Sequence, residues 1–442
     1  MSTARKSLLQ LFVPICLETL LLMLAGMVDT LMLSSVSDDA VGAVGTANTY
    51  IGVFIIMFAV VSTGMIAVMT QNIGAGRPGI AYQARQLGLA FNAVLGIVMS
   101  VFLCFCSGMI LDLVGIAEAL REPAEIYFQI VGSFCICNAL IPIFAAYLRA
   151  FGFSKQPLIA TIVGNVINLI LNAIFLFGLH WGVAGVAWAT GISRVVNLCI
   201  VAFLSWKLVK AKQYPQRMAN RQVLAQIIQV GFPSALENVI YNVAMTLVIR
   251  LLNQMDATGM NVTARSYAVQ VTNFALCAGS ALAQANAILT GWRIGAEEIE
   301  DCNRGTRKAA LIGILIATGL EAIFALTGPW ILSIFTDDPQ MISLVVKLLA
   351  IDIILESGRV TNLVYGQALK TSGDAIFPVV LAVIFMFLCA VGGTYLFGIR
   401  MELGAVGAYI ALTSDEVSRA IGMIIRWKSG KWRKKGLISA AK

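Results

Sequence analysis

Apolar stretches separated by short polar breaks run along the whole chain. Each is long enough to cross a hydrocarbon core of ~30 Å as a helix that rises ~1.5 Å per residue. Lipid offers no hydrogen bonds, so such segments must satisfy their backbone groups internally. The pattern predicts an all-α integral membrane protein with twelve transmembrane helices, at about 8–33, 48–72, 87–112, 125–148, 158–180, 183–206, 226–252, 263–290, 309–334, 343–368, 376–398 and 403–427.

The longest polar break carries several Lys and Arg residues and lies midway along the chain. It predicts two six-helix bundles joined by a cytoplasmic linker, with a basic cytoplasmic tail at the end. The expected boundaries are 1–206 and 226–427 for the bundles, 207–225 for the linker and 428–442 for the tail.

Short motifs recur in the same order in the two halves, which indicates an internal repeat. Pro14-Ile-Cys-Leu-Glu18 is matched by Pro233-Ser-Ala-Leu-Glu237, and Ile73-Gly74-Ala75 is matched by Ile294-Gly295-Ala296. Six spans per half is an even number, so both halves begin on the same side of the membrane. We therefore expect parallel repeats related by a pseudo-two-fold axis along the membrane normal.

The composition supports a membrane protein and sets its orientation. The chain is 59% hydrophobic and 12% charged, whereas soluble domains average about 25% charged. Most of the 31 Lys and Arg residues lie in the breaks on the side of the two termini. Because cytoplasmic loops are rich in Lys and Arg, both termini should be cytoplasmic. The compact chain and its short loops favour a bacterial inner membrane. We also expect the lipid bilayer as a partner and a protein that functions as a monomer.

Several function classes are disfavoured. The net charge of +8 is spread over short loops rather than gathered in one patch, so we do not expect nucleic-acid binding. The chain has one His and no nucleophile–base set, metal-ligand cluster or phosphate-binding glycine loop. We therefore expect that the protein is not an enzyme and binds no cofactor. Its energy source should be an ion gradient.

Polar side chains inside the first half's apolar runs are the first functional candidates. A carboxylate such as Asp29 is costly in a membrane and usually marks a functional site. Without a fixed cationic partner it is driven toward neutrality, so it can bind H⁺, or keep its charge by binding Na⁺. Asn168 and Asn172 are four residues apart, so they share one helix face, and Thr190 adds another neutral oxygen.

Other candidates have two readings each. Pro14 is either a hinge in the first span or a mark of its start. Glu18 and Glu237 either line a substrate cavity or form local hydrogen bonds. Glu356 and Arg359 share a helix face as i and i+3. They form either a structural ion pair or part of a second coupling or substrate site.

The chain resembles the multidrug and toxic compound extrusion (MATE) family over nearly its whole length. The resemblance rests on Pro14 with Asp29, Gln71-Asn-Ile-Gly74-Ala-Gly76, Leu148-Arg-Ala-Phe-Gly152, Asn165-x-x-Asn168-x-x-x-Asn172, Gly182-Val-Ala-Gly185 and Gly373-Asp374. It implies secondary-active efflux of amphipathic and cationic drug-like compounds in exchange for H⁺ or Na⁺. It also implies that Asp29, Asn168, Asn172 and Thr190 lie together in a cation pocket.

One departure from the family pattern bears on the ion. Many members have Asp where this chain has Asn172, which leaves Asp29 as the only obvious titrating group of the pocket and favours H⁺ slightly over Na⁺. The alternative function is that of a flippase for lipid-linked precursors or polysaccharides, in the related superfamily. It is disfavoured because the intramembrane acids outnumber the intramembrane arginines.

Overall fold

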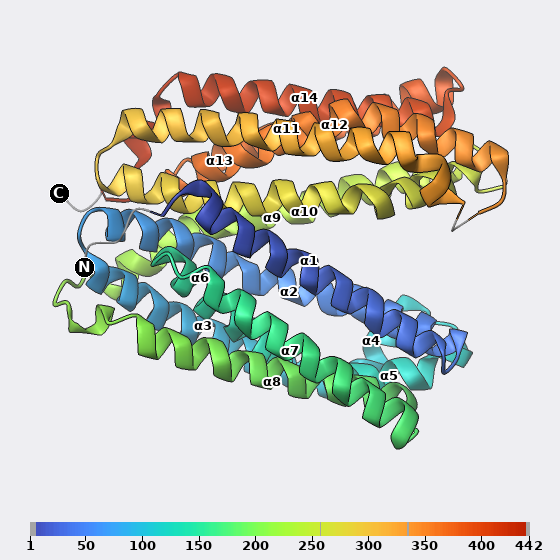
Figure 1. Cartoon of the computed structure of the whole chain (residues 1–442), viewed down its shortest axis with the longest axis horizontal. Coiled ribbons are helices and arrows are strands. Elements are labelled where there is room, and N and C mark those ends of the chain that lie inside the picture. The colour runs from blue at the N-terminus through green and yellow to red at the C-terminus, as the bar shows by residue number, and fades with distance from the viewer. Residues whose placement is uncertain (1–5, 257, 334–335, 439–442) are drawn as a thin grey trace. The chain divides into compact units, whose positions relative to one another are not determined.

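The computed structural model describes residues 6–256, 258–333 and 336–438. Helices are the only regular secondary structure in these residues. The chain divides into two compact units, Met1–Gly231 and Phe232–Lys442. Figure 1 shows the helices of each unit running alongside one another.

Unit 1 holds eight α-helices and two short helical segments within the described residues. They are α1 (Leu8–Ser34), α2 (Asp38–Gly74), α3 (Pro78–Phe105), α4 (Ser107–Val114), α5 (Glu118–Ser133), α6 (Cys135–Ala150), α7 (Lys155–Ala173), the π-helical η1 (Ile174–Gly178), α8 (Gly182–Leu208) and the 3-10 segment η2 (Ala211–Gln213).

Unit 2 takes up most of α9, a long helix that begins within unit 1. Its helices are α9 (Asn220–Asn253), α10 (Met260–Gly295), α11 (Ile299–Leu332), α12 (Pro339–Thr371), α13 (Ile376–Phe385), the π-helical η3 (Met386–Val391) and η4 (Thr394–Arg400), α14 (Gly404–Lys428) and the 3-10 segment η5 (Lys431–Lys435). In this unit α12 packs against α10, α11 and α14.

The described helices account for the twelve predicted spans. Nine helical segments are long and apolar enough to cross a membrane, and α5 with α6 forms a tenth span bent by 46°. The other two are α12 and α14, which are long enough but carry Asp, Glu and Arg within the helix. The all-α, twelve-span fold in two bundles is confirmed. The charges in α12 and α14 are those of the ionic network described below.

The predicted linker is partly helical in the structure. Helix α8 continues to Leu208 and α9 begins at Asn220, so regular structure enters 207–225 from both ends. Between them the chain is fastened to α3, because Gln83 donates from Nε2 to the Met218 carbonyl at 2.6 Å and accepts from the Met218 amide at 3.0 Å.

The predicted basic tail folds onto unit 2 as far as it is described. Trp432 is 1% exposed and stacks on Trp427 at 4.3 Å. Lys435 forms an ion pair of 2.7 Å with Asp374, a carboxylate that also accepts from Arg426. Residues 439–442 of the tail and 1–5 of the first bundle lie outside the described residues.

Candidate functional site

A pocket of about 160 Å³ lies inside unit 1, between helices that are far apart in the sequence. Asp29 reaches it from α1, Tyr127 from α5, Asn168 from α7, and Thr190 and Arg194 from α8. These helices pack together in the described structure, with α7 lying against both α1 and α8. The lining is polar although the helices that form it are largely apolar.

The predicted face of α7 meets Asp29. Asn172 donates from Nδ2 to Asp29 Oδ1 at 2.7 Å and to Asn168 Oδ1 at 3.3 Å. Both asparagines are buried, and the i, i+4 spacing places them on the same side of the helix. The structure thus brings together Asp29, Asn168, Asn172 and Thr190.

Two further residues of this pocket were not assigned from the sequence. Tyr127 donates from its hydroxyl to Asn48 Oδ1 at 3.2 Å. Arg194 lines the same pocket and is a charge that acts on Asp29. No ion pair joins the two side chains within the described residues, but Asp29 and Arg194 carry opposite charges in one pocket. Arg194 stands out in the sequence as a charge inside an apolar run, one helical turn after Thr190, but the sequence does not show which pocket it lines.

Pro14 lies inside α1, and this position decides between its two interpretations, a hinge or a mark of the helix start. Ser7 and Gln10 form a capping box that starts the helix at Leu8, so Pro14 does not mark the helix start. A proline inside a helix removes one backbone hydrogen bond and favours a kink there.

Glu18 lies one turn beyond Pro14 and is held by a cation. Arg149 of α6 donates from Nη2 to Glu18 Oε2 at 2.7 Å, with side-chain exposures of 15% and 9%. Glu237 in α9 is placed in the same way, one turn after Pro233, and forms an ion pair of 2.6 Å with Lys370 of α12. Neither carboxylate is left to local hydrogen bonds alone.

Unit 2 contains a second cavity, of about 230 Å³. Glu237 and Lys370 both line it, together with Tyr241, Arg359 and Asn362. Glu416 and Arg419 of α14 form another part of the cavity wall. Leu276 and Met386 add apolar surface, so the cavity presents apolar atoms beside paired charges.

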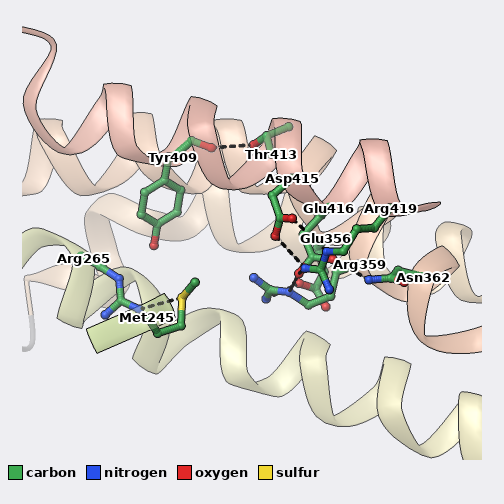
Figure 2. A network of polar contacts seen from close by, with 10 residues as sticks. All are labelled: Met245, Arg265, Glu356, Arg359, Asn362, Tyr409, Thr413, Asp415, Glu416 and Arg419. Carbon is green, nitrogen blue, oxygen red and sulfur yellow. Dashed lines mark hydrogen bonds and ion pairs between the residues drawn. The ribbon is translucent and has the colours of Figure 1, made fainter. Parts of the chain in front are cut away.

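The charges of this wall form one network between α12 and α14, shown in Figure 2. Arg359 forms the predicted pair with Glu356, at 2.8 Å from Nη1, and also reaches Glu416 Oε1 from Nε at 3.3 Å. Glu416 accepts as well from Asn362 and Arg419. Spacing along α12 could predict the pair with Glu356, whereas Glu416 comes from another helix.

Arg419 closes the network with a two-point contact to Asp415. Its Nε and Nη2 donate to the two carboxylate oxygens at 2.9 and 2.7 Å. In the described residues, no group of three or more His, Cys, Asp or Glu side chains is arranged to hold a metal ion.

The MatE family model matches residues 14–174 and 233–396, which together make up more than half of the chain. The chain belongs to the MATE family. It is 32% identical to the "Uncharacterized transporter YisQ" of Bacillus subtilis over 98% of this chain and 96% of that one. It is 23% identical to the "Probable multidrug resistance protein NorM" of Thermotoga maritima, over 98% and 94% of the two chains.

Solved structures agree with the fold. The crystal structure of MATE in the bent conformation matches with a TM-score of 0.87 and 20% identity, covering 96% of this chain and 94% of that one. The MATE protein described here is thus a multi-pass membrane transporter of a multidrug efflux family, and not an enzyme.

Proposed function

We propose that this MATE protein is a proton-coupled antiporter that exports amphipathic, often cationic, organic compounds. The observation that carries the proposal is the pocket of unit 1, where the buried amide of Asn172 donates to Asp29 and Arg194 lines the same space. A carboxyl group placed in this way can gain or lose one proton, and each such step changes the net charge of the pocket.

The orientation of Asn172 favours H⁺ over Na⁺. Its Nδ2 faces Asp29, so in this arrangement Asn172 acts on the carboxylate as a hydrogen-bond donor and presents no oxygen ligand beside it. Sodium also needs several oxygen ligands around one point, and the guanidinium of Arg194 only donates. The alternative ion, Na⁺, would have to be held by Asp29, Asn168 and Thr190.

The transport cycle follows from the charge balance of the pocket. With Asp29 ionised, Arg194 compensates it. When a proton arrives from outside, the pocket gains a positive charge, and the hydrogen bond from Asn172 weakens because its acceptor is neutral. Helix α1 then moves about Pro14 and the substrate is released. Coupling requires only that the proton binds the two states with different affinity.

The cavity of unit 2 fits an amphipathic substrate better than a lipid-linked pyrophosphate. Its three cations, Arg359, Lys370 and Arg419, are each paired with a carboxylate. A polyanion would have to break several of these pairs. The flippase function thus remains the second candidate. We further propose that the protein works as a monomer in the inner membrane, with both termini cytoplasmic.

The test uses proteoliposomes containing the wild type, Asp29→Asn or Asp112→Asn, with drug transport measured under an imposed pH gradient and then under a Na⁺ gradient. The pH gradient should drive transport in the wild type and in Asp112→Asn, because Asp112 is half exposed and pairs with Arg121 at the surface. Asp29→Asn should lose most of it. Transport driven by Na⁺ alone would overturn the proposed ion, and an active Asp29→Asn would move coupling to unit 2.

A further inference from the structure

The chain that follows α14 turns back onto unit 2. Gly430, just after the helix, has a left-handed backbone with φ 67°, a conformation that glycine adopts without strain. In the η5 segment that comes next, the buried Trp432 stacks on Trp427 of α14, and its Nε1 donates to the Trp427 carbonyl at 2.9 Å. Segment η5 is therefore fastened to the end of α14 by its aromatic residue.

The loop between α12 and α13 holds the same segment at a second point. Lys435 forms its 2.7 Å ion pair with Asp374, a carboxylate whose side chain is fully buried. A Cβ atom on Gly373 would overlap the Lys435 carbonyl, so the two backbones are in contact. Two separate parts of unit 2 thus fix the position of η5.

The remaining lysines of η5 lie on a different face of the segment. A 3-10 helix has three residues per turn, so residues three apart share a face. Trp432 and Lys435 are three apart, and both contact unit 2. Lys431 and Lys434 are also three apart, both are exposed, and neither forms an ion pair within the described residues. One face therefore holds the segment in place while another presents two unpaired ammonium groups.

The lipid-facing side of α14 ends next to these lysines. Ile421 and Ile425 are 53% and 62% exposed, and their i, i+4 spacing places them on one side of the helix. In a membrane protein such an exposed apolar side faces the acyl chains. Lys428 lies seven residues after Ile421, so it continues the same side, and it is exposed without an ion pair among the described residues. A lysine at this place reaches the level of the lipid headgroups.

We propose that Lys428, Lys431 and Lys434 form a binding site for the phosphate headgroup of an anionic phospholipid at the end of α14. An ammonium group binds phosphate as a compact point charge with three donors. The occupant is a lipid because the site continues the exposed apolar side of α14, against which acyl chains pack. It is an anionic lipid because three unpaired cations favour a headgroup with a net negative charge.

Native mass spectrometry of the full-length protein, with phosphatidylglycerol or phosphatidylcholine of the same acyl chains, measures this binding. The wild type should bind phosphatidylglycerol in preference. A lysine near an anionic lipid surface contributes about fivefold to binding, so the double variant Lys431→Gln/Lys434→Gln should lose about 25-fold in affinity for phosphatidylglycerol. Lys428→Gln alone should lose about fivefold. Equal binding of the two lipids by the wild type would overturn the proposal.

The matched control is Lys210→Gln/Lys212→Gln, which removes the same charge at the other 3-10 segment, η2. These two lysines are exposed but only two residues apart, so they lie on different faces of the turn. This variant should keep the affinity of the wild type. An equal loss in both double variants would show a general attraction to basic residues and would overturn the site.

Two further measurements test the geometry and the occupant. Trp432→Ala keeps all three lysines but removes the buried stack, so its affinity should fall toward that of the double lysine variant. An unchanged affinity would overturn the role of the ordered turn. Inorganic phosphate, at the same concentration of phosphate groups, should not displace phosphatidylglycerol from the wild type. Displacement would make a free anion the occupant and would overturn the lipid site.

Discussion

At the scale of single residues, two carboxylates at matching places in the two repeats are each paired with a cation from another helix. Glu18 and Glu237 occupy equivalent places in the two repeats, one turn after Pro14 and Pro233. Each is held by a cation from a distant helix of its own unit, at 2.7 and 2.6 Å. The repeat thus preserves the ion pair as well as the Pro–Glu motif.

Removing one partner of such an ion pair should lower the free energy of unfolding more than removing both partners. Arg149→Met leaves the nearly buried Glu18 without its cation and should destabilise the protein by about 3 kcal/mol, the low end for a broken buried pair. Adding Glu18→Gln should recover part of this loss. Detergent titration checks this prediction. It gives the free energy of unfolding of the two single variants and of the double variant. Additive effects would contradict a direct interaction.

The stability of the start of α10 should depend on pH through a single residue, Asp256. Burial raises the pKa of Asp256, but hydrogen bonds from Asn261, Thr258 and Met260 outweigh it and lower the pKa from 3.8 to about 2. The ionised carboxylate caps the start of α10, accepting from the Met260 amide at 2.9 Å. Its stabilising effect is complete above the unfolded pKa and is lost as the pH falls through the folded value.

Hydrogen exchange at the start of α10 measures this effect. The amides of Met260 and Asn261 should stay protected at pH 5 and lose protection as the pH approaches about 2, relative to their intrinsic exchange rates. Asp256→Ala should reduce protection at every pH, whereas Asp337→Ala, at an exposed loop acid, should not. Equal protection at pH 5 and pH 2 would show that the charge of Asp256 does not hold the cap.

At the scale of elements, α2 and the start of α9 cross with their backbones in contact. A Cβ atom on Gly64 would overlap the carbonyl of Ile227, and one on Gly231 would overlap the carbonyl of Val60. Only glycine allows this approach. The contact fastens the first turns of α9 to unit 1, which explains why the unit boundary falls inside α9.

Gly64→Ala should force this crossing apart. The expected loss is at least about 1–3 kcal/mol, as for overpacking in a core. Gly45→Ala is the matched control, because it lies in the same helix with nothing within 4 Å of the added carbon. The two variants are compared by their unfolding midpoints and by the yield of folded protein. If both variants were equally stable, the close crossing would not matter to the fold.

At the scale of the whole molecule, the distribution of Lys and Arg predicts the orientation. A fluorescent protein fused after Lys442 should fold and fluoresce in the cytoplasm, and alkaline phosphatase fused there should be inactive. Fusion after Asp338, in the acidic loop that follows the ninth predicted span, should give the opposite pair of results. The reverse pattern would show that both termini lie outside.

Much of the architecture could be predicted because each span is a local property of the chain. Apolar length alone located the spans, but the helix ends could not be read from it. Helix α2 begins at Asp38, where Ser37 caps it, well before the apolar run. The π-helical turns in the eleventh span, from Met386 to Arg400, had no signal in the apolar pattern.

The sequence by itself determined the twelve spans, their division into two repeats, and the shared face of Asn168 and Asn172, because apolar length and helical period depend only on neighbours along the chain. The tertiary structure alone decided that Arg149 holds Glu18, that Arg194 shares the pocket of Asp29, and that neither carboxylate oxygen of Glu321 meets a hydrogen-bond donor within the described residues. Those outcomes depend on which helices pack side by side. A buried charge is stabilised or left bare by groups from other helices, and helical spacing within one segment cannot name them.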